Sequence, residues 1–167
     1  MKAMRALLTV VWLGAIPADA ADDDFAVRIL AAHNAERSAL DLPPLVWDDA
    51  LAADAAVWAK HLAGTGSFQH ALYTDRRGMG ENLWEGKAGD YSLEDMVAGW
   101  ARQKRYFRYG RFPDVSATGR WYDVADYTRM IWKNTSSVGC AMAEGRGTYV
   151  LVCRYDPPGN MLGEWPY

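Results

Sequence analysis

The sequence predicts an α+β domain in which helices come first and a pair of β-strands follows. Apolar residues recur at helical spacing in several segments before residue 107, whereas residues 138–143 and 148–155 read as two strand runs, the second of them rich in β-branched and aromatic residues. The only two cysteines, Cys140 and Cys153, fall one in each of these runs. Because the helical and strand patterns do not alternate, a parallel βαβ arrangement is disfavoured.

The N-terminus has the three parts of a secretory signal. Lys2 and Arg5 give a positive start, residues 6–17 form an apolar stretch too short to span a bilayer, and residues 18–20 read Ala-Asp-Ala, a cleavage motif. We therefore expect a signal peptide over residues 1–20 and a single domain over residues 21–167. The alternative is an uncleaved N-terminal anchor. No later apolar segment is long enough to cross a membrane.

The charge of the mature chain argues against nucleic-acid binding. Removing Lys2, Arg5 and Asp19 leaves 16 basic and 20 acidic residues, a net charge of −4. Binding to phosphate backbones needs a basic surface.

Three helices are expected before the strands. Residues 25–40 carry Phe25, Ile29 and His33 at a spacing of four, and the prolines at 43 and 44 end the pattern. Asp48 is a good cap for a second helix over residues 50–62, which Gly64 and Gly66 would stop. Residues 92–95, Ser-Leu-Glu-Asp, resemble a capping box for a third helix that runs to about residue 107.

Between the second and third helices, residues 64–89 read as a long polar loop. It contains His70 and the run Gly80-Glu81-Asn82-Leu83. Structureless loops of that length are usually functional or disordered, and the presence of His70 and this run favours function. After the third helix, residues 109–122 look irregular and residues 124–133 predict a short helix.

The last two segments, residues 138–143 and 148–155, predict an antiparallel pair of strands that turns at Arg146-Gly147. Residue numbers across that ladder sum to 293, which places Cys140 opposite Cys153. In an exported protein this pairing favours a disulfide, worth about 3 kcal/mol for a loop of this length. Two buried thiols are the alternative.

Spacing alone points to no familiar catalytic site. The three histidines, at 33, 61 and 70, form no H-x-x-x-H pair, and C-x-x-C, G-x-S-x-G and phosphate-loop motifs are absent from the sequence. From the residues alone the chain is an exported α+β domain with one acidic, histidine-containing loop.

Six short blocks, in order, resemble the CAP superfamily of cysteine-rich secretory proteins, antigen-5 allergens and plant pathogenesis-related proteins. They are His33-Asn34-Ala35-Glu36-Arg37, Leu45-Val46-Trp47, Gly80-Glu81-Asn82-Leu83, the run Tyr127 to Trp132, and the cysteine-containing segments from Val138 to Ala141 and from Val152 to Asn160. The resemblance covers residues 29–166. It implies a three-layer α-β-α sandwich with a central antiparallel sheet.

The resemblance also implies a cleft that holds two histidines and two glutamates, of which the histidines bind zinc or another divalent ion in many members. The matching positions here are His70, Glu81, Gln103 and Asp126, so two of the four depart from the family pattern. His70 and Asp126 together would suit a harder ion than zinc, and we keep Zn²⁺, Mg²⁺ and Ca²⁺ as possible cofactors, none of them required. The alternatives are a polar pocket without metal and an ion pair of Asp126 with Arg129 or another arginine.

Several other residues have structural interpretations. His33 is expected to be a hydrogen-bonded core histidine, and Asn34, Arg37, Asn82 and Trp132 belong to the resemblance blocks as structural residues. Trp84 and Trp121 are candidates for lining a cleft or binding an apolar ligand. A cluster of basic residues lies around the end of the third helix and comprises Arg102, Lys104, Arg105, Arg108 and Arg111. It predicts a solvated face, with lipid head groups as the less favoured partner.

Three classes of function fit these observations. The favoured one is a non-catalytic binding module outside the cell, extracellular or periplasmic, for a lipid-like, sterol-like or protein ligand. The second is a metal-dependent, protease-like hydrolase that uses His70 and Glu81, although we assign no catalytic residue. The third is a structural or signalling protein of the cell envelope. The short signal and single domain suggest a bacterial protein, though a eukaryotic secreted protein would also fit.

Overall fold

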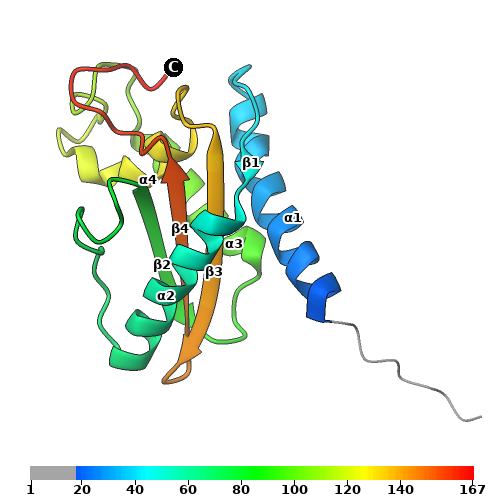
Figure 1. Ribbon diagram of the computed structural model, residues 1–167. Coiled ribbons are helices and arrows are strands. Elements are labelled where there is room, and N and C mark those ends of the chain that lie inside the picture. The colour runs from blue at the N-terminus through cyan, green and yellow to red at the C-terminus, as the bar shows by residue number, and fades with distance from the viewer. Residues whose placement is uncertain (1–17) are drawn as a thin grey trace, which may run out of the picture.

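The computed structural model describes residues 18–167, which form helices packed on both faces of a four-stranded sheet (Figure 1). The expected signal peptide lies outside the described residues except for residues 18–20, which begin the first helix. Within residues 18–167, no helix combines the length and the apolar character that crossing a membrane requires.

The helices are α1 (Ala18–Ser38), α2 (Asp49–Thr65), α3 (Leu93–Ala101) and the short α4 (Ala125–Met130), with 3₁₀ turns η1 (Arg102–Tyr106) and η2 (Trp121–Asp123). Local signals explain two of the helix starts. The side chain of Asp48 accepts hydrogen bonds from the backbone N–H groups of Ala50 and Leu51, and Ser92 forms the predicted reciprocal capping box with Asp95.

Several helix bounds differ from the sequence-based expectation. The second helix continues through Gly64 and stops at Gly66, whose φ of 71° forms a left-handed cap. The third helix ends at Ala101, and η1 takes its place up to Tyr106 instead of a continuous helix to residue 107. The first helix begins before the expected Phe25, at Ala18.

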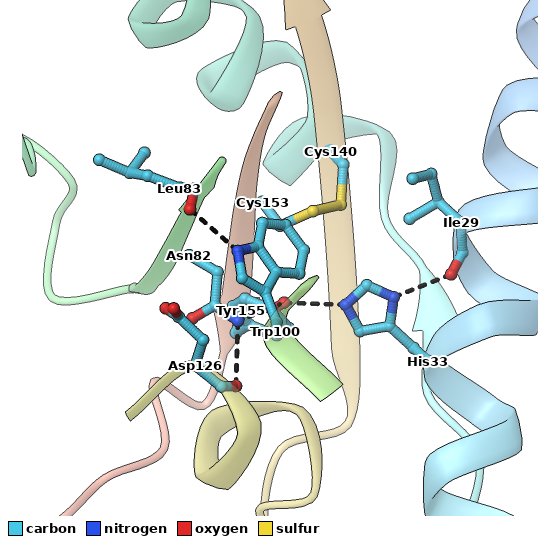
Figure 2. Close-up of a disulfide and its surroundings, with 9 residues drawn as sticks. All are labelled: Ile29, His33, Asn82, Leu83, Trp100, Asp126, Cys140, Cys153 and Tyr155. Carbon is cyan, nitrogen blue, oxygen red and sulfur yellow. Dashed lines mark hydrogen bonds between the residues drawn. A yellow bond between two sulfur atoms is a disulfide. The ribbon is translucent and has the colours of Figure 1, made fainter. Parts of the chain in front are cut away.

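The sheet has the order β1-β3-β4-β2, built from β1 (Val46–Trp47), β2 (Gly80–Lys87), β3 (Ser137–Gly145) and β4 (Thr148–Asp156). The predicted register is confirmed, because Cys140 lies opposite Cys153 and the two form a disulfide (Figure 2). The turn at Arg146-Gly147 has positive φ angles of 56° and 78°, as a tight hairpin requires.

The expected loop over residues 64–89 is wrong in its second half, since β2 occupies residues 80–87 and pairs with β4 along its whole length. Its first four residues are buried and its last four alternate between half-buried and exposed, so it lacks the simple alternation that signals a strand. The sheet is also not wholly antiparallel, because the two-residue β1 runs parallel to β3.

Alternating side chains of β4 divide the core between the two faces of the sheet. Val150 and Val152 pack with α2, whereas Leu151, Cys153 and Tyr155 pack with α1, α3 and α4. The three-layer α-β-α arrangement is therefore present, with α2 alone on one face (Figure 1).

Small residues let α2 approach the sheet closely. A Cβ atom added at Gly139 would lie 2.3 Å from the backbone nitrogen of Ala52, and one at Gly145 would lie 2.2 Å from the carbonyl oxygen of Ala63. Residues 141 and 143 between them are alanines. The glycine before Cys140 is thus a packing requirement of α2.

Candidate functional site

The four cleft positions come from four separate segments and meet as two pairs. His70 lies in the loop before β2, Glu81 on β2, Gln103 in η1 and Asp126 at the start of α4. His70 Nδ1 lies 2.6 Å from Glu81 Oε1, and Gln103 Nε2 donates to Asp126 Oδ2 at 2.8 Å.

Gln103 uses both ends of its amide. Its Oε1 accepts from the backbone N–H groups of Asp126 and Tyr127, at 3.0 and 3.2 Å, while its Nε2 donates to the Asp126 carboxylate. A glutamate at position 103 would accept from the same two N–H groups but, when ionised, would repel Asp126. Glutamine therefore suits a neighbour that is acidic rather than imidazole.

Asp126 does not form the ion pair with Arg129 that the sequence left open. The Arg129 guanidinium donates instead to the Glu81 carbonyl and to Asn82 Oδ1, both at 2.8 Å. Burial raises the pKa of Asp126, while the charge of Arg129, the hydrogen bond from Gln103 and the charge of His70 act in the opposite direction.

Glu81 is fully buried and its carboxylate is fully engaged. Oε1 accepts from His70 and from the backbone N–H of Ala71 at 3.1 Å, and Oε2 accepts from Arg154. Arg154 also donates to Asp54 of α2 at 2.8 Å, so a buried ion-pair chain ties α2 to the sheet. The sequence reasoning missed Arg154 and Asp54, although a lone arginine within the apolar β4 was a signal for such a pair.

A divalent ion at His70 and Asp126 remains a prediction, and the donors fit such an ion poorly. Each of the two side chains already has a partner, Glu81 for His70 and Gln103 for Asp126. Within residues 18–167 no three His, Cys, Asp or Glu side chains are grouped so that they could hold a metal. Zinc and other divalent ions in proteins are usually held by at least three protein ligands, or by fewer protein ligands together with several waters.

A chain of hydrogen bonds runs from the cleft into the core. Asn82 Nδ2 donates to the Asp126 carbonyl and to the Tyr155 hydroxyl, each at 3.1 Å. His33 Nδ1 lies 2.8 Å from the Ile29 carbonyl and its Nε2 lies 2.8 Å from the Tyr155 hydroxyl (Figure 2). Since a carbonyl only accepts, Nδ1 carries the proton and Nε2 accepts from Tyr155.

This arrangement confirms His33 as a core histidine. Burial, with the nearby charge of Arg37 as a smaller factor, outweighs the Ile29 hydrogen bond and lowers the pKa of His33 to about 4. His33 is therefore neutral at pH 7.

The remaining residues of the first block tie α1 to loops. Asn34 exchanges two hydrogen bonds with the backbone of Leu45, at 2.8 and 3.1 Å. Arg37 is 1% exposed and donates to four carbonyls, those of Pro43, Met130, Trp132 and Thr135. These residues are structural, as expected, and Trp132 is buried in a small cluster of its own.

The tryptophan candidates lie apart from each other. Trp84 is half-buried, with its ring 5.1 Å from that of Tyr91, and Trp121 is 45% exposed beside Phe112. Neither lines the apolar groove described next, so their proposed ligand contacts remain predictions.

A groove of about 690 Å³ lies between α1 and α2, along the edge of β3. Figure 1 shows α1 and α2 on either side of this edge. Phe25, Trp47 and Met142 are its large apolar residues, and α2 contributes a stripe at helical spacing that comprises Asp49, Ala52, Ala56 and Lys60. Sequence patterns did not indicate this groove, because its residues come from four elements, α1, β1, α2 and β3, whose relative placement only the fold determines.

Comparison with known proteins agrees with this architecture. Residues 30–155 match the profile of the CAP family, described as the cysteine-rich secretory protein family. Pathogenesis-related protein 1A of Nicotiana tabacum is 36% identical over 139 residues, which cover 83% of this chain and 78% of that protein. Pathogenesis-related protein 1 of Arabidopsis thaliana is 34% identical over 137 residues, covering 81% and 78%.

Solved structures support the same conclusion. NaASP2, crystallised with Zn²⁺, has a TM-score of 0.74 at 22% identity, over 86% of this chain and 85% of that one. MpPR-1i is 30% identical with a TM-score of 0.57, over 81% and 89% of the two chains. The matching residues, the relatives and the shared three-layer fold together show that this chain belongs to the cysteine-rich secretory protein (CAP) family.

Proposed function

We propose that this protein is a secreted binding module that holds a lipid-like or sterol-like ligand in the groove between α1 and α2. The observation that carries this proposal is the groove itself. Its volume of about 690 Å³ falls within the range of about 300–1,000 Å³ typical of small-molecule sites. Its large apolar side chains suit a hydrocarbon ligand.

The polar residues of the groove would orient an amphiphile. Lys60 lines the groove and forms no ion pair with another described residue, so its ammonium is available to a carboxylate or hydroxyl. Asp49 holds the Trp47 indole through a hydrogen bond of 3.1 Å, which fixes one aromatic wall. A few placed polar groups in an apolar site provide orientation and specificity.

The cleft supports binding rather than hydrolysis. A general base must reach the proton that it removes, whereas Glu81 is 0% exposed and its carboxylate accepts from three donors. Gln103 carries no proton-accepting carboxylate, and the only cysteines are joined. Export to the extracellular space or periplasm is part of the proposal, supported by the signal-like N-terminus and the family.

Titration with a fluorescent fatty acid and a fluorescent sterol tests the groove. We expect saturable binding of at least one of them to the purified protein, and a loss of affinity of about tenfold or more in Ala56→Trp, because a large side chain there fills the groove. Ala53→Trp is the matched control, since Ala53 lies on the exposed face of α2. Thermal melting of both variants checks that they fold.

Two results would overturn the proposal. One is equal affinity in the Ala56 and Ala53 variants. The other is no binding of either probe together with peptide hydrolysis that Zn²⁺ stimulates and His70→Ala abolishes, which would favour the hydrolase. A protein partner captured without any lipid binding would favour the envelope-protein alternative.

A further inference from the structure

A second hollow lies at the end of α3, away from the groove and sharing no residue with it. Its volume is about 330 Å³, and its lining includes Arg102, Arg105, Tyr106, Thr118, Arg120 and Asp123. It is formed by the end of α3 with η1 on one side, and by η2 with the loop that leads into it on the other. Gln103 also lines it, so the hollow adjoins the cleft.

The hollow concentrates positive charge in an acidic protein. Residues 102–120 contain six arginines and lysines but one acidic residue, Asp114, whereas the chain as a whole has a formal net charge of −3. Cations near a helix C-terminus are often only a solvated face that suits the helix dipole. The placement of the individual side chains goes beyond that explanation.

The basic residues of η1 divide into two sets. Lys104 has a carboxylate partner on α1, with Nζ 2.9 Å from Glu36 Oε1. Arg102 and Arg105 line the hollow and form no ion pair with any residue whose side chain the structure describes. The hollow therefore gathers two guanidinium groups that no described carboxylate contacts at ion-pair distance.

The third arginine is held in place from the other side of the hollow. Asp123 Oδ2 accepts from Arg120 Nε at 3.0 Å and from the Thr118 hydroxyl at 2.6 Å. The Arg105 guanidinium lies over the Tyr106 ring, 4.6 Å from its centre. These contacts restrict the side chains of Arg105 and Arg120 before any ligand arrives, which reduces the entropy lost on binding.

We propose that this hollow binds a phosphate monoester. Planar guanidinium groups form paired hydrogen bonds with phosphate oxygens, and Thr118 adds a hydroxyl at the rim. The volume of about 330 Å³ is about ten times the share of one liquid water, about 30 Å³, which leaves room for the phosphate and the beginning of the group that carries it.

The phosphate monoester could belong to a lipid in a membrane or to a small soluble molecule. Trp121 and Tyr122 follow Arg120 and are 45% and 57% exposed. Aromatic residues with a polar end favour the interface between a membrane and water. The experiment therefore separates the two sources.

Vesicle co-sedimentation and calorimetry test the proposal on the purified protein. The vesicles are phosphatidylcholine alone, phosphatidylcholine with phosphatidic acid, whose head group is a phosphate monoester, and phosphatidylcholine with charge-matched phosphatidylserine, a diester. Glycerol 3-phosphate is the soluble probe. Arg102→Gln/Arg105→Gln is compared with Lys87→Gln/Lys133→Gln, which removes the same charge at exposed positions outside the hollow.

We expect binding to phosphatidic acid vesicles, to glycerol 3-phosphate or to both, weakened about thirtyfold by the arginine substitutions and little changed by the lysine substitutions. Binding to the vesicles alone assigns the membrane source, and binding to glycerol 3-phosphate without the vesicles assigns the soluble one. Equal binding to phosphatidylserine vesicles, an equal loss in both double variants, or no binding to either monoester would overturn the proposal.

Discussion

The buried ion pair between Glu81 and Arg154 gives the sharpest prediction about stability. Both side chains are almost completely buried, at 0% and 2% exposure. Glu81→Gln keeps the shape of the side chain but removes the charge that faces the Arg154 guanidinium. It also replaces one of the two carboxylate oxygens, which together accept from three donors, with an amide NH₂ group that cannot accept.

Removing one member of a buried pair usually costs about 3–5 kcal/mol, because the other charge stays buried without compensation. Arg154 keeps Asp54, 2.8 Å from its Nε, so the expected loss lies at the lower end, about 3 kcal/mol. For a domain of this size that corresponds to a fall in Tm of about 6–12 °C.

Urea unfolding of the wild type, Glu81→Gln and Glu85→Gln measures this loss. Glu85 is exposed on the same strand, and its variant should stay within about 0.5 kcal/mol of the wild type. Glu81→Gln/Arg154→Met should lose clearly less than the sum of the two single variants, since it leaves no unpaired buried arginine. A loss below about 1 kcal/mol in Glu81→Gln, or strict additivity, would refute this reasoning.

Three further predictions concern packing, acid stability and the disulfide. Gly139→Ala should lower the free energy of unfolding by about 1–3 kcal/mol or more, because its Cβ would meet the backbone of α2. Gly64 lies within α2 with open space around it, so Gly64→Ala should raise that free energy by about 0.5–1 kcal/mol. The opposite ranking in chemical denaturation would contradict the packing argument. Burial lowers the pKa of His33 in the folded protein to about 4, against an ordinary value of 6.5. The unfolded chain therefore binds the extra proton, and the free energy of unfolding should fall by about 3 kcal/mol as pH drops from 6.5 to 4. In His33→Gln this part of the pH dependence should disappear from the unfolding curves, and an unchanged dependence of the unfolding free energy on pH would show that His33 is not its source. Reduction of the disulfide that closes the loop between Cys140 and Cys153 should cost about 3 kcal/mol, and alkylation without reductant should add no label, whereas two labels would show free thiols.

Much of the fold follows from local sequence signals. The Asp48 cap, the Ser92 capping box and the Arg146-Gly147 turn each satisfy backbone groups within a few residues, so their effect does not depend on distant packing. The cysteine register follows from that turn because an antiparallel ladder is fixed once its turn is fixed.

The predictions that were wrong or incomplete concern features that depend on contacts between residues far apart in the sequence. β2 is a strand because it pairs with β4 over eight residues, and its own pattern is polar at both ends. The four cleft positions were located by resemblance, but their pairing was not, since Gln103 reaches Asp126 only through the placement of η1 beside α4. The predicted ion pair of Asp126 with Arg129 is absent because the Arg129 guanidinium donates instead to the backbone carbonyls of Glu81 and Pro158.

The central claim is that the ligand binds in the groove between α1 and α2 and leaves the His70–Glu81 cleft unoccupied. NMR titration with the fatty acid or sterol that binds in the fluorescence assay tests this claim most directly, using the methyl groups of Met142 and Ala56 and the imidazole of His70 as reporters. The account predicts saturable shifts at Met142 and Ala56 with the His70 signals unmoved. Shifts at His70 without change at Met142 and Ala56 would contradict it and place the binding site in the cleft.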